Sequence, residues 1–203
     1  MEPFRVAFVP GVTPDKWARI WGERGKGPLE LQPIDETAPR DVLTAGSADM
    51  CFARLPLERE GLHLIPLYRE MPVVVVSKEH VLSVLDEVTA EDLADELELD
   101  QAGITLKQAV ETVAAGTGYL VLPMSVARIH QRKDVVTRPL VAGEESQIGL
   151  AWRIDNEDPR IEDFIGIVRG RTERSSRDQP AAKPKKKTAP SKRTTSSKPN
   201  RRR

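Results

Sequence analysis

The stretch Phe4-Arg5-Val6-Ala7-Phe8-Val9-Pro10-Gly11-Val12-Thr13-Pro14 decides the fold of this chain of 203 residues. Its first six residues are mostly apolar and predict a buried strand, which Pro10-Gly11 ends in a turn. Thr13-Pro14 then predicts a helix that is capped by the Thr13 hydroxyl and has proline at its first position. A buried strand that leads through a tight turn into a helix indicates a parallel α/β sheet.

The next segments repeat this alternation. We predict strands over Leu29–Ile34 and Ala48–Ala53, with a helix over Pro39–Ala45 between them that ends at Gly46. Strand, helix, strand, helix and strand in this order are typical of a parallel sheet with helices on both faces.

Two further extended stretches follow, Leu62–Tyr68 and Met71–Val76, and each contains a proline. Proline lacks a backbone N–H, so we expect these stretches at edge or crossover positions rather than in central strands. Beyond them the sequence predicts helices that begin near Thr89, Thr105, Met124 and Pro159, and strands over Tyr119–Leu122, Val135–Leu140 and Ile148–Arg153.

The charge is divided unequally along the chain. The whole sequence has 31 basic and 31 acidic residues. Residues 171–203 hold 13 Lys or Arg against two acids, a net charge of +11, which leaves 18 basic and 29 acidic residues in 1–170, a net charge of −11. The last 33 residues contain no Val, Ile, Leu, Phe, Tyr, Trp or Met, so we predict a disordered basic tail.

Several classes of protein are excluded by the same composition. No apolar run approaches the roughly 18 residues that a membrane-spanning helix needs, and we expect no export signal and a cytoplasmic location. One cysteine, Cys51, rules out an intramolecular disulfide and is expected to be a buried thiol. His63, His80 and His130 have no metal-ligand spacing, so we predict no metal, no cofactor and no enzyme activity.

Four stretches together resemble the effector-binding (substrate-binding) domain of LysR-type transcriptional regulators. They are Phe4–Val9 with the helix after Thr13, Ala48–Ala53, Leu64–Glu70 with Val73–His80, and Val113-Ala114-Ala115-Gly116-Thr117-Gly118-Tyr119-Leu120-Val121-Leu122-Pro123. The resemblance covers roughly residues 4–169. It implies the two-lobed type II periplasmic-binding-protein-like fold, an α/β fold, and a homodimer.

On this resemblance, lobe I comprises residues 1–70 plus 147–170, lobe II comprises 71–146, and residues 171–203 form the tail. Two differences from the family stand out. The first strand begins at Phe4, so we expect no helix-turn-helix DNA reader, and Ala94–Ile104 is short, so we expect a reduced second lobe.

The family binds small ligands between its lobes, and the candidate residues follow from where the predicted strands and helices end. Gly11, Val12 and Thr13 are expected to hold a carboxylate, with an ordinary helix cap as the alternative. Arg54 follows the third strand and is a candidate anion clamp, or else the ion-pair partner of Glu58. Two further candidates are Ser77 and Thr105, and for the latter a capping box with Gln108 is the structural alternative.

Two functions are compatible with these patterns. The first is a non-catalytic domain that senses a small anionic effector of unknown identity. The second is a sequence-independent nucleic-acid-associated protein that acts through its tail, with the body as a dimerisation scaffold. The tail residues expected to contact phosphate are Lys183, Lys185, Lys186, Lys187, Lys192, Arg193, Lys198, Arg201, Arg202 and Arg203. Eight carboxylates between Asp86 and Asp100 either attract such a basic segment or form a solvated surface, which we favour.

Overall fold

The computed structural model of the chain describes residues 2–171. Its elements in chain order are β1 (Phe4–Phe8), α1 (Asp15–Glu23), β2 (Leu29–Pro33), α2 (Pro39–Thr44), β3 (Met50–Leu55), β4 (Leu62–Glu70), β5 (Pro72–Ser77), the 3₁₀ helix η1 (Val81–Val84), α3 (Leu106–Ala114), β6 (Leu120–Pro123), α4 (Met124–Ile129), β7 (Val135–Pro139), β8 (Ser146–Arg153) and α5 (Arg160–Val168). The predicted basic tail lies outside the described residues, apart from Arg171.

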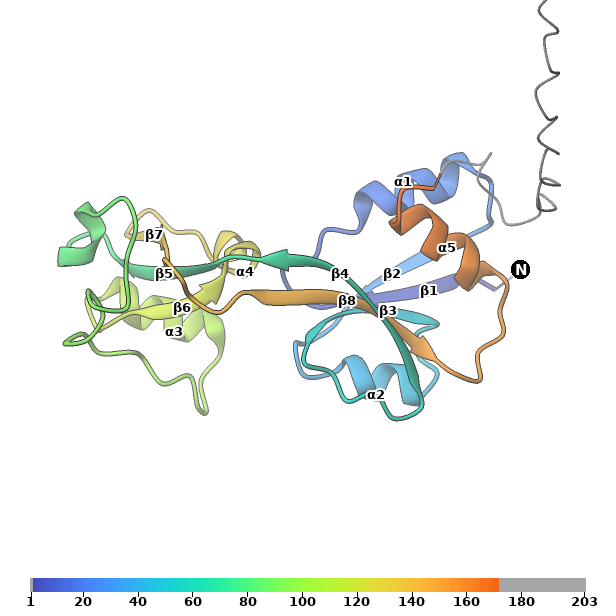
Figure 1. The fold of residues 1–203 in the computed structure, drawn as a ribbon, viewed down its shortest axis with the longest axis horizontal. Coiled ribbons are helices and arrows are strands. Elements are labelled where there is room, and N and C mark those ends of the chain that lie inside the picture. Colours follow the sequence, from blue (N-terminus) through green and yellow to red (C-terminus); the bar gives the residue numbers. More distant parts are fainter. Residues whose placement is uncertain (1, 172–203) are drawn as a thin grey trace, which may run out of the picture. The chain divides into compact units, whose positions relative to one another are not determined.

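Five strands form the larger sheet, in the order β2-β1-β3-β8-β4. β1 pairs in parallel with β2 and with β3, as the alternating segments predicted. β8 returns from the far end of the chain and lies antiparallel between β3 and β4. Figure 1 shows α1 and α5 on one face of this sheet and α2 on the other.

Aromatic side chains fill the face of the larger sheet beneath α1 and α5. The ring of Phe4 stacks on Trp21 with centroids 5.2 Å apart, and Phe164 packs edge-on against Trp21 at 5.8 Å. The indole N–H of Trp21 donates to the carbonyl of Gly27 at 2.9 Å, so the one polar atom of this ring is satisfied within the core. This packing anchors α1, and with it the loop that precedes α1.

The smaller sheet has three antiparallel strands in the order β6-β5-β7. Alternate valines of β5 enter two different clusters. Val73 and Val75 pack beneath α3 and α4, while Val74 and Val76 pack beneath η1 and the segment around Val88. Because both faces are covered, residues 73–76 of β5 are all valine rather than alternately apolar and polar.

The chain passes between the two sheets twice, from β4 to β5 through Met71 and from β7 to β8. The expectation for the two proline-containing stretches is confirmed for β4, which is an edge strand. It is wrong for β5, which is the central strand of the smaller sheet. Pro72 is tolerated there because it is the first residue of β5, where its carbonyl still accepts a hydrogen bond from the Leu140 N–H at 3.1 Å.

Two local predictions are corrected. Thr13 does not cap α1, because the helix starts one residue later than expected, with Pro14 at the cap position and no side-chain cap. No helix begins at Thr89: the Asp92 carboxylate accepts hydrogen bonds from the backbone N–H and the hydroxyl of Thr89, but the chain continues as turns rather than as a helix. Within residues 2–171, no helix is long and apolar enough to cross a membrane.

Candidate functional site

A hollow of about 580 Å³ lies between the β1–α1 loop, the end of β4 and α4. Pockets that bind small organic molecules typically measure roughly 300–1,000 Å³. The lining residues come from the β1–α1 loop, α1 and β4 on one side and from α4 on the other. They are Gly11, Val12, Thr13, Lys16, Trp17, Tyr68, Glu70, Ser125, Arg128 and Ile129. We call this hollow the cleft.

Gly11 lies close against Ser125 of α4 across the cleft. Its φ of +92° lies in the left-handed region that favours glycine. A Cβ atom added there would lie 2.2 Å from the Oγ of Ser125 in α4, a distance that no real Cβ contact reaches. Glycine is therefore required at position 11 both for the turn and for the contact with α4.

Several polar side chains that line the cleft have no partner within the described part of the chain. The side chains of Lys16 and Arg128 form no ion pair or hydrogen bond with any other residue between positions 2 and 171. The buried hydroxyl of Ser125 likewise has no partner in this part of the chain. Two available cations and an unsatisfied hydroxyl around a partly apolar hollow favour a small organic anion.

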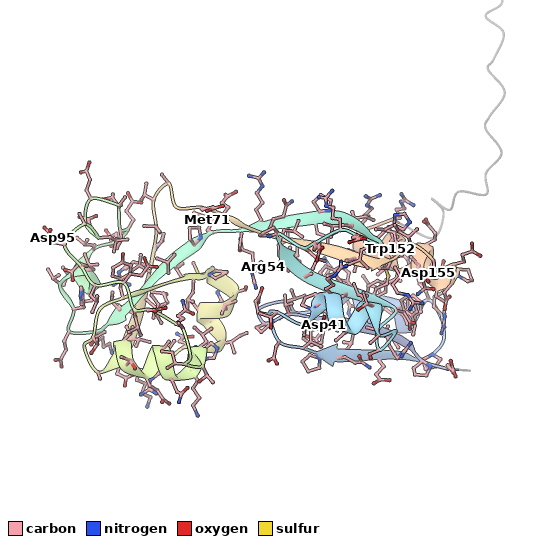
Figure 2. The ribbon with its side chains drawn as sticks, turned by 90° about the horizontal axis from the view of Figure 1, so that it is seen from below. Asp41, Arg54, Met71, Asp95, Trp152 and Asp155 are labelled. Carbon is pink, nitrogen blue, oxygen red and sulfur yellow. The ribbon has the colours of Figure 1, made fainter. Side chains whose placement is uncertain are left out.

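Arg54 lies behind the cleft rather than inside it. Its Nη2 contacts Glu70 Oε2 at 2.7 Å and the Pro10 carbonyl at 3.3 Å, and its Nη1 contacts Glu36 Oε2 at 2.6 Å. Figure 2 shows Arg54 close to Met71, the residue that joins β4 to β5. Arg54 thus binds the loop that lines the cleft and the end of the strand that leads out of the larger sheet.

The alternative partner expected for Arg54 is wrong. Glu58 pairs with Arg40 instead, at 3.3 Å, because β3 ends at Leu55 and no helix follows to bring positions 54 and 58 onto one face. Burial alone lowers the pKa of Arg54, but its hydrogen bonds to Glu70 and Glu36 outweigh that effect and raise it above its ordinary value.

Tyr68 completes this side of the cleft. Burial raises its pKa to about 12, and the nearby Glu70 carboxylate acts in the same direction, while Arg54 opposes it. The phenol therefore stays protonated at any physiological pH and can donate a hydrogen bond into the cleft.

Ser77 and Thr105 are not among the residues that line the cleft. Ser77 ends β5, at the opposite end from the crossover, and its Oγ accepts a hydrogen bond from the Glu79 N–H at 3.4 Å. Thr105 caps α3 in a reciprocal capping box with Gln108, which confirms the structural alternative for this residue. A ligand role for either residue stays a prediction.

Sequence reasoning missed Lys16, Tyr68, Glu70, Ser125 and Arg128. Lys16 lies in the first turn of the predicted first helix, and Ser125 and Arg128 lie in the helix predicted from Met124. Their positions just after a strand end were a usable signal for a site in an open α/β sheet. That these side chains meet in one cleft could not be predicted, because it depends on how the two sheets face each other.

Cys51 has no part in this site. Its side chain is fully buried in β3, and burial raises the pKa of the thiol to about 12, so it is not a nucleophile at neutral pH. Within residues 2–171, no three His, Cys, Asp or Glu side chains form a group that could hold a metal ion.

Solved structures share this fold. The regulatory domain of OxyR from Pseudomonas aeruginosa, in a cysteine-to-aspartate mutant, is 22% identical with a TM-score of 0.66, and the match covers 83% of this chain and 97% of that one. The BenM effector binding domain with its effector benzoate is 19% identical with a TM-score of 0.68, over 82% and 90% of the two chains. The fold is therefore that of the two-lobed effector-binding domains of LysR-type regulators.

Sequence comparison agrees with this class. Residues 26–97 match the family model of the LysR substrate binding domain. The HTH-type transcriptional regulator AlsR of Bacillus subtilis (strain 168) is 27% identical over 170 residues, which cover 68% of this chain and 55% of AlsR. The chain thus spans little more than half the length of that relative. Residues 26–97 are therefore similar to a LysR substrate-binding domain, and the body has the fold of such domains.

Proposed function

We propose that this domain senses a small organic anion held in the cleft and that it has no catalytic role. The observation that carries the proposal is a pair of cations without partners among residues 2–171, Lys16 from lobe I and Arg128 from lobe II, which line one hollow. A carboxylate offers oxygen acceptors to both cations and to the Ser125 hydroxyl, while Trp17 and Ile129 supply apolar surface for the rest of the ligand.

Binding acts through the two lobes. The ligand contacts Gly11–Thr13 and Lys16 on one side of the cleft and Ser125 and Arg128 on the other. It therefore stabilises the arrangement in which these residues face the same hollow. It shifts the population only by the difference in its affinity for that arrangement and for more open ones. As part of the proposal, lobe I is residues 1–70 plus 147–170 and lobe II is 71–146, and the domain acts in the cytoplasm as a homodimer.

The test is a thermal-shift screen of small carboxylates against the full chain, because a ligand that binds only the folded state raises its melting temperature. The benzoate that BenM binds is one of these compounds. For a carboxylate that stabilises the protein, Lys16→Gln and Arg128→Gln are each expected to weaken binding by about tenfold, the loss of one charge-assisted contact.

A matched control is Lys107→Gln, an exposed lysine of α3 that does not line the cleft. This variant is expected to bind as the unmodified protein does. A screen without any stabilising carboxylate, or equal losses in all three variants, would reject the cleft as an anion site.

A second candidate function is supported by the charge of the sequence alone. Residues 171–203 carry a net charge of +11 beside a body of −11. Such a segment binds nucleic acid through phosphate contacts, without sequence preference and with a steep dependence on salt. Removal of all residues after Gly170 is expected to abolish any binding to a duplex DNA of arbitrary sequence at low salt. Equal binding by the shortened body would reject this role.

A further inference from the structure

Lobe II contains a second hollow that is separate from the cleft. It measures about 240 Å³ and lies between α3, α4 and the strands β5 and β7. Its floor consists of core side chains that are at most 8% exposed: Val75, Val110, Leu122, Ala127 and Val135. A dry cavity of roughly 150 Å³ is already large enough to hold a benzene molecule.

The hollow exists because the helices do not cover the whole sheet. α3 and α4 pack against β5 and β6. The α4 helix ends at Ile129, and residues 130–134 turn back into β7. The apolar face that this sheet presents beneath the helices therefore continues to Val135 of β7, where no further turn of helix follows to fill the space.

Polar groups surround the mouth of this hollow. The side chains of His130, Gln131 and Thr137 line it, and none of the three forms a hydrogen bond within the described part of the chain. An apolar floor with a few free hydrogen-bonding groups at its rim is the usual composition of a small-molecule site.

The electrostatics distinguish this hollow from the cleft. Its lining contains one arginine, Arg138, whose guanidinium donates to the carbonyls of Ser83, Leu85 and Thr137. Each nitrogen of this guanidinium is thus already engaged by a backbone carbonyl of the protein. The hollow consequently suits an uncharged molecule, whereas the cleft suits an anion.

We propose that the lobe II hollow is a second ligand site, which takes a small uncharged aromatic molecule with one hydrogen-bonding group, such as a phenol. The ring lies on Val75, Val110 and Ala127, and the polar group reaches His130, Gln131 or Thr137. This site does not depend on the anion proposed for the cleft.

The two sites share α4. Ser125 and Arg128 line the cleft, whereas Ala127 lines the lobe II hollow, about 200° around the helix axis from Ser125. Figure 1 shows α4 beside the strands of the smaller sheet. A ligand that displaces α4 from one side changes the position of groups on the other, so the affinities of the two sites are coupled, and the coupling is reciprocal.

The experiment is a titration of the full chain with phenol, followed by methyl and amide NMR. Saturable shifts are expected for the methyl groups of Ala127, Val110 and Val135, and the amides of Ser125 and Arg128 are expected to shift with the same dissociation constant. Ala127→Leu, which fills the hollow, is expected to abolish the methyl shifts. Lys107→Gln, an exposed residue of α3 that lines neither hollow, is the matched control and is expected to retain them.

If Ala127→Leu does not fold, Thr137→Val and Gln131→Ala provide the same information. At least one of them is expected to weaken phenol binding by about two- to tenfold, the loss of one hydrogen bond. The absence of saturable methyl shifts at millimolar phenol, or unchanged shifts in every hollow variant, would overturn the site. Methyl shifts without any response at Ser125 and Arg128 would overturn the coupling.

Discussion

Arg54 and Glu70 form a nearly buried ion pair, 2.7 Å apart, at the point where β4 leaves the larger sheet for the crossover. The Arg54 side chain is 11% exposed and that of Glu70 is 8% exposed. The pair joins a central strand to the last residue before Met71, while the same guanidinium holds the Pro10 carbonyl of the cleft loop. The cleft and the crossover are therefore fixed by one side chain.

Removal of Arg54 is expected to be costly, because Glu70 is then left buried without its partner. We expect Arg54→Met to lower the free energy of unfolding by about 3 kcal/mol, and the double variant Arg54→Met with Glu70→Gln to recover part of that loss. Urea unfolding followed by tryptophan fluorescence measures the free energy of unfolding of the single and the double variant.

The control for this pair is Arg19→Met. Arg19 pairs with Glu23 on the exposed surface of α1, where we expect a loss below about 1 kcal/mol. A loss from Arg54→Met no greater than that from Arg19→Met would mean that the Arg54–Glu70 pair does not stabilise the fold.

Gly11 is expected to control how closely the two lobes approach. Gly11→Ala places a Cβ against the Ser125 hydroxyl, so the cleft loop and α4 must separate. Spin labels on cysteines introduced at the exposed positions Arg19 and Lys107 report this as a longer distance between the lobes.

Gly61→Ala is the matched control for Gly11→Ala. Gly61 also has a positive φ, +73°, but a Cβ there meets nothing within 4 Å. The Gly61→Ala variant therefore has the same kind of backbone strain but no added contact between the lobes. The distribution of distances between its two spin labels is expected to stay unchanged. An unchanged distribution in Gly11→Ala would show that the Gly11–Ser125 contact does not hold the lobes together.

Cys51 is expected to be inert in the folded protein. A buried thiol whose pKa is raised to about 12 is neither ionised nor accessible at pH 8. Ellman's reagent is expected to react with it only after urea unfolds the chain, and dilute peroxide is expected to leave it unmodified in intact-mass measurements. Rapid reaction of the native protein with one equivalent of the reagent would contradict this assignment.

The hydrogen bond between Asp134 and Arg132 can be tested through the pKa of the Asp134 carboxyl. Its hydrogen bond with Arg132 is the first cause that lowers the pKa of this carboxyl, to about 2. Because the pKa is depressed in the folded state, the stabilisation is present above its ordinary value of about 4 and is lost as the pH falls through about 2. Arg132→Gln is expected to return the carboxyl pKa toward its ordinary value in an NMR titration, and an unchanged pKa would exclude this pair as the cause.

Local patterns predicted most of the larger sheet. The alternation from Phe4 to Ala53 indicated three strands and two helices, and the parallel pairing of β1 with β2 and β3 confirms the arrangement. The capping box at Thr105 and the helix stop at Gly46 were also readable, because both depend on residues within a few positions of one another. The failures near Thr13 and Thr89 are local too, since a hydroxyl that can cap a helix can equally close a turn or remain exposed.

What the sequence determined by itself is the class of fold, the separation of an acidic body from a basic segment, and one side of the cleft at Gly11, Val12 and Thr13. These follow from composition and from periodicities over short stretches. Only the tertiary structure decided which groups meet. Arg54 pairs with Glu70 and Glu36, Gly11 touches Ser125, and Lys16 shares a hollow with Arg128. Each of these relationships joins residues at least 16 positions apart, and such contacts are set by the packing of the two sheets rather than by any local pattern.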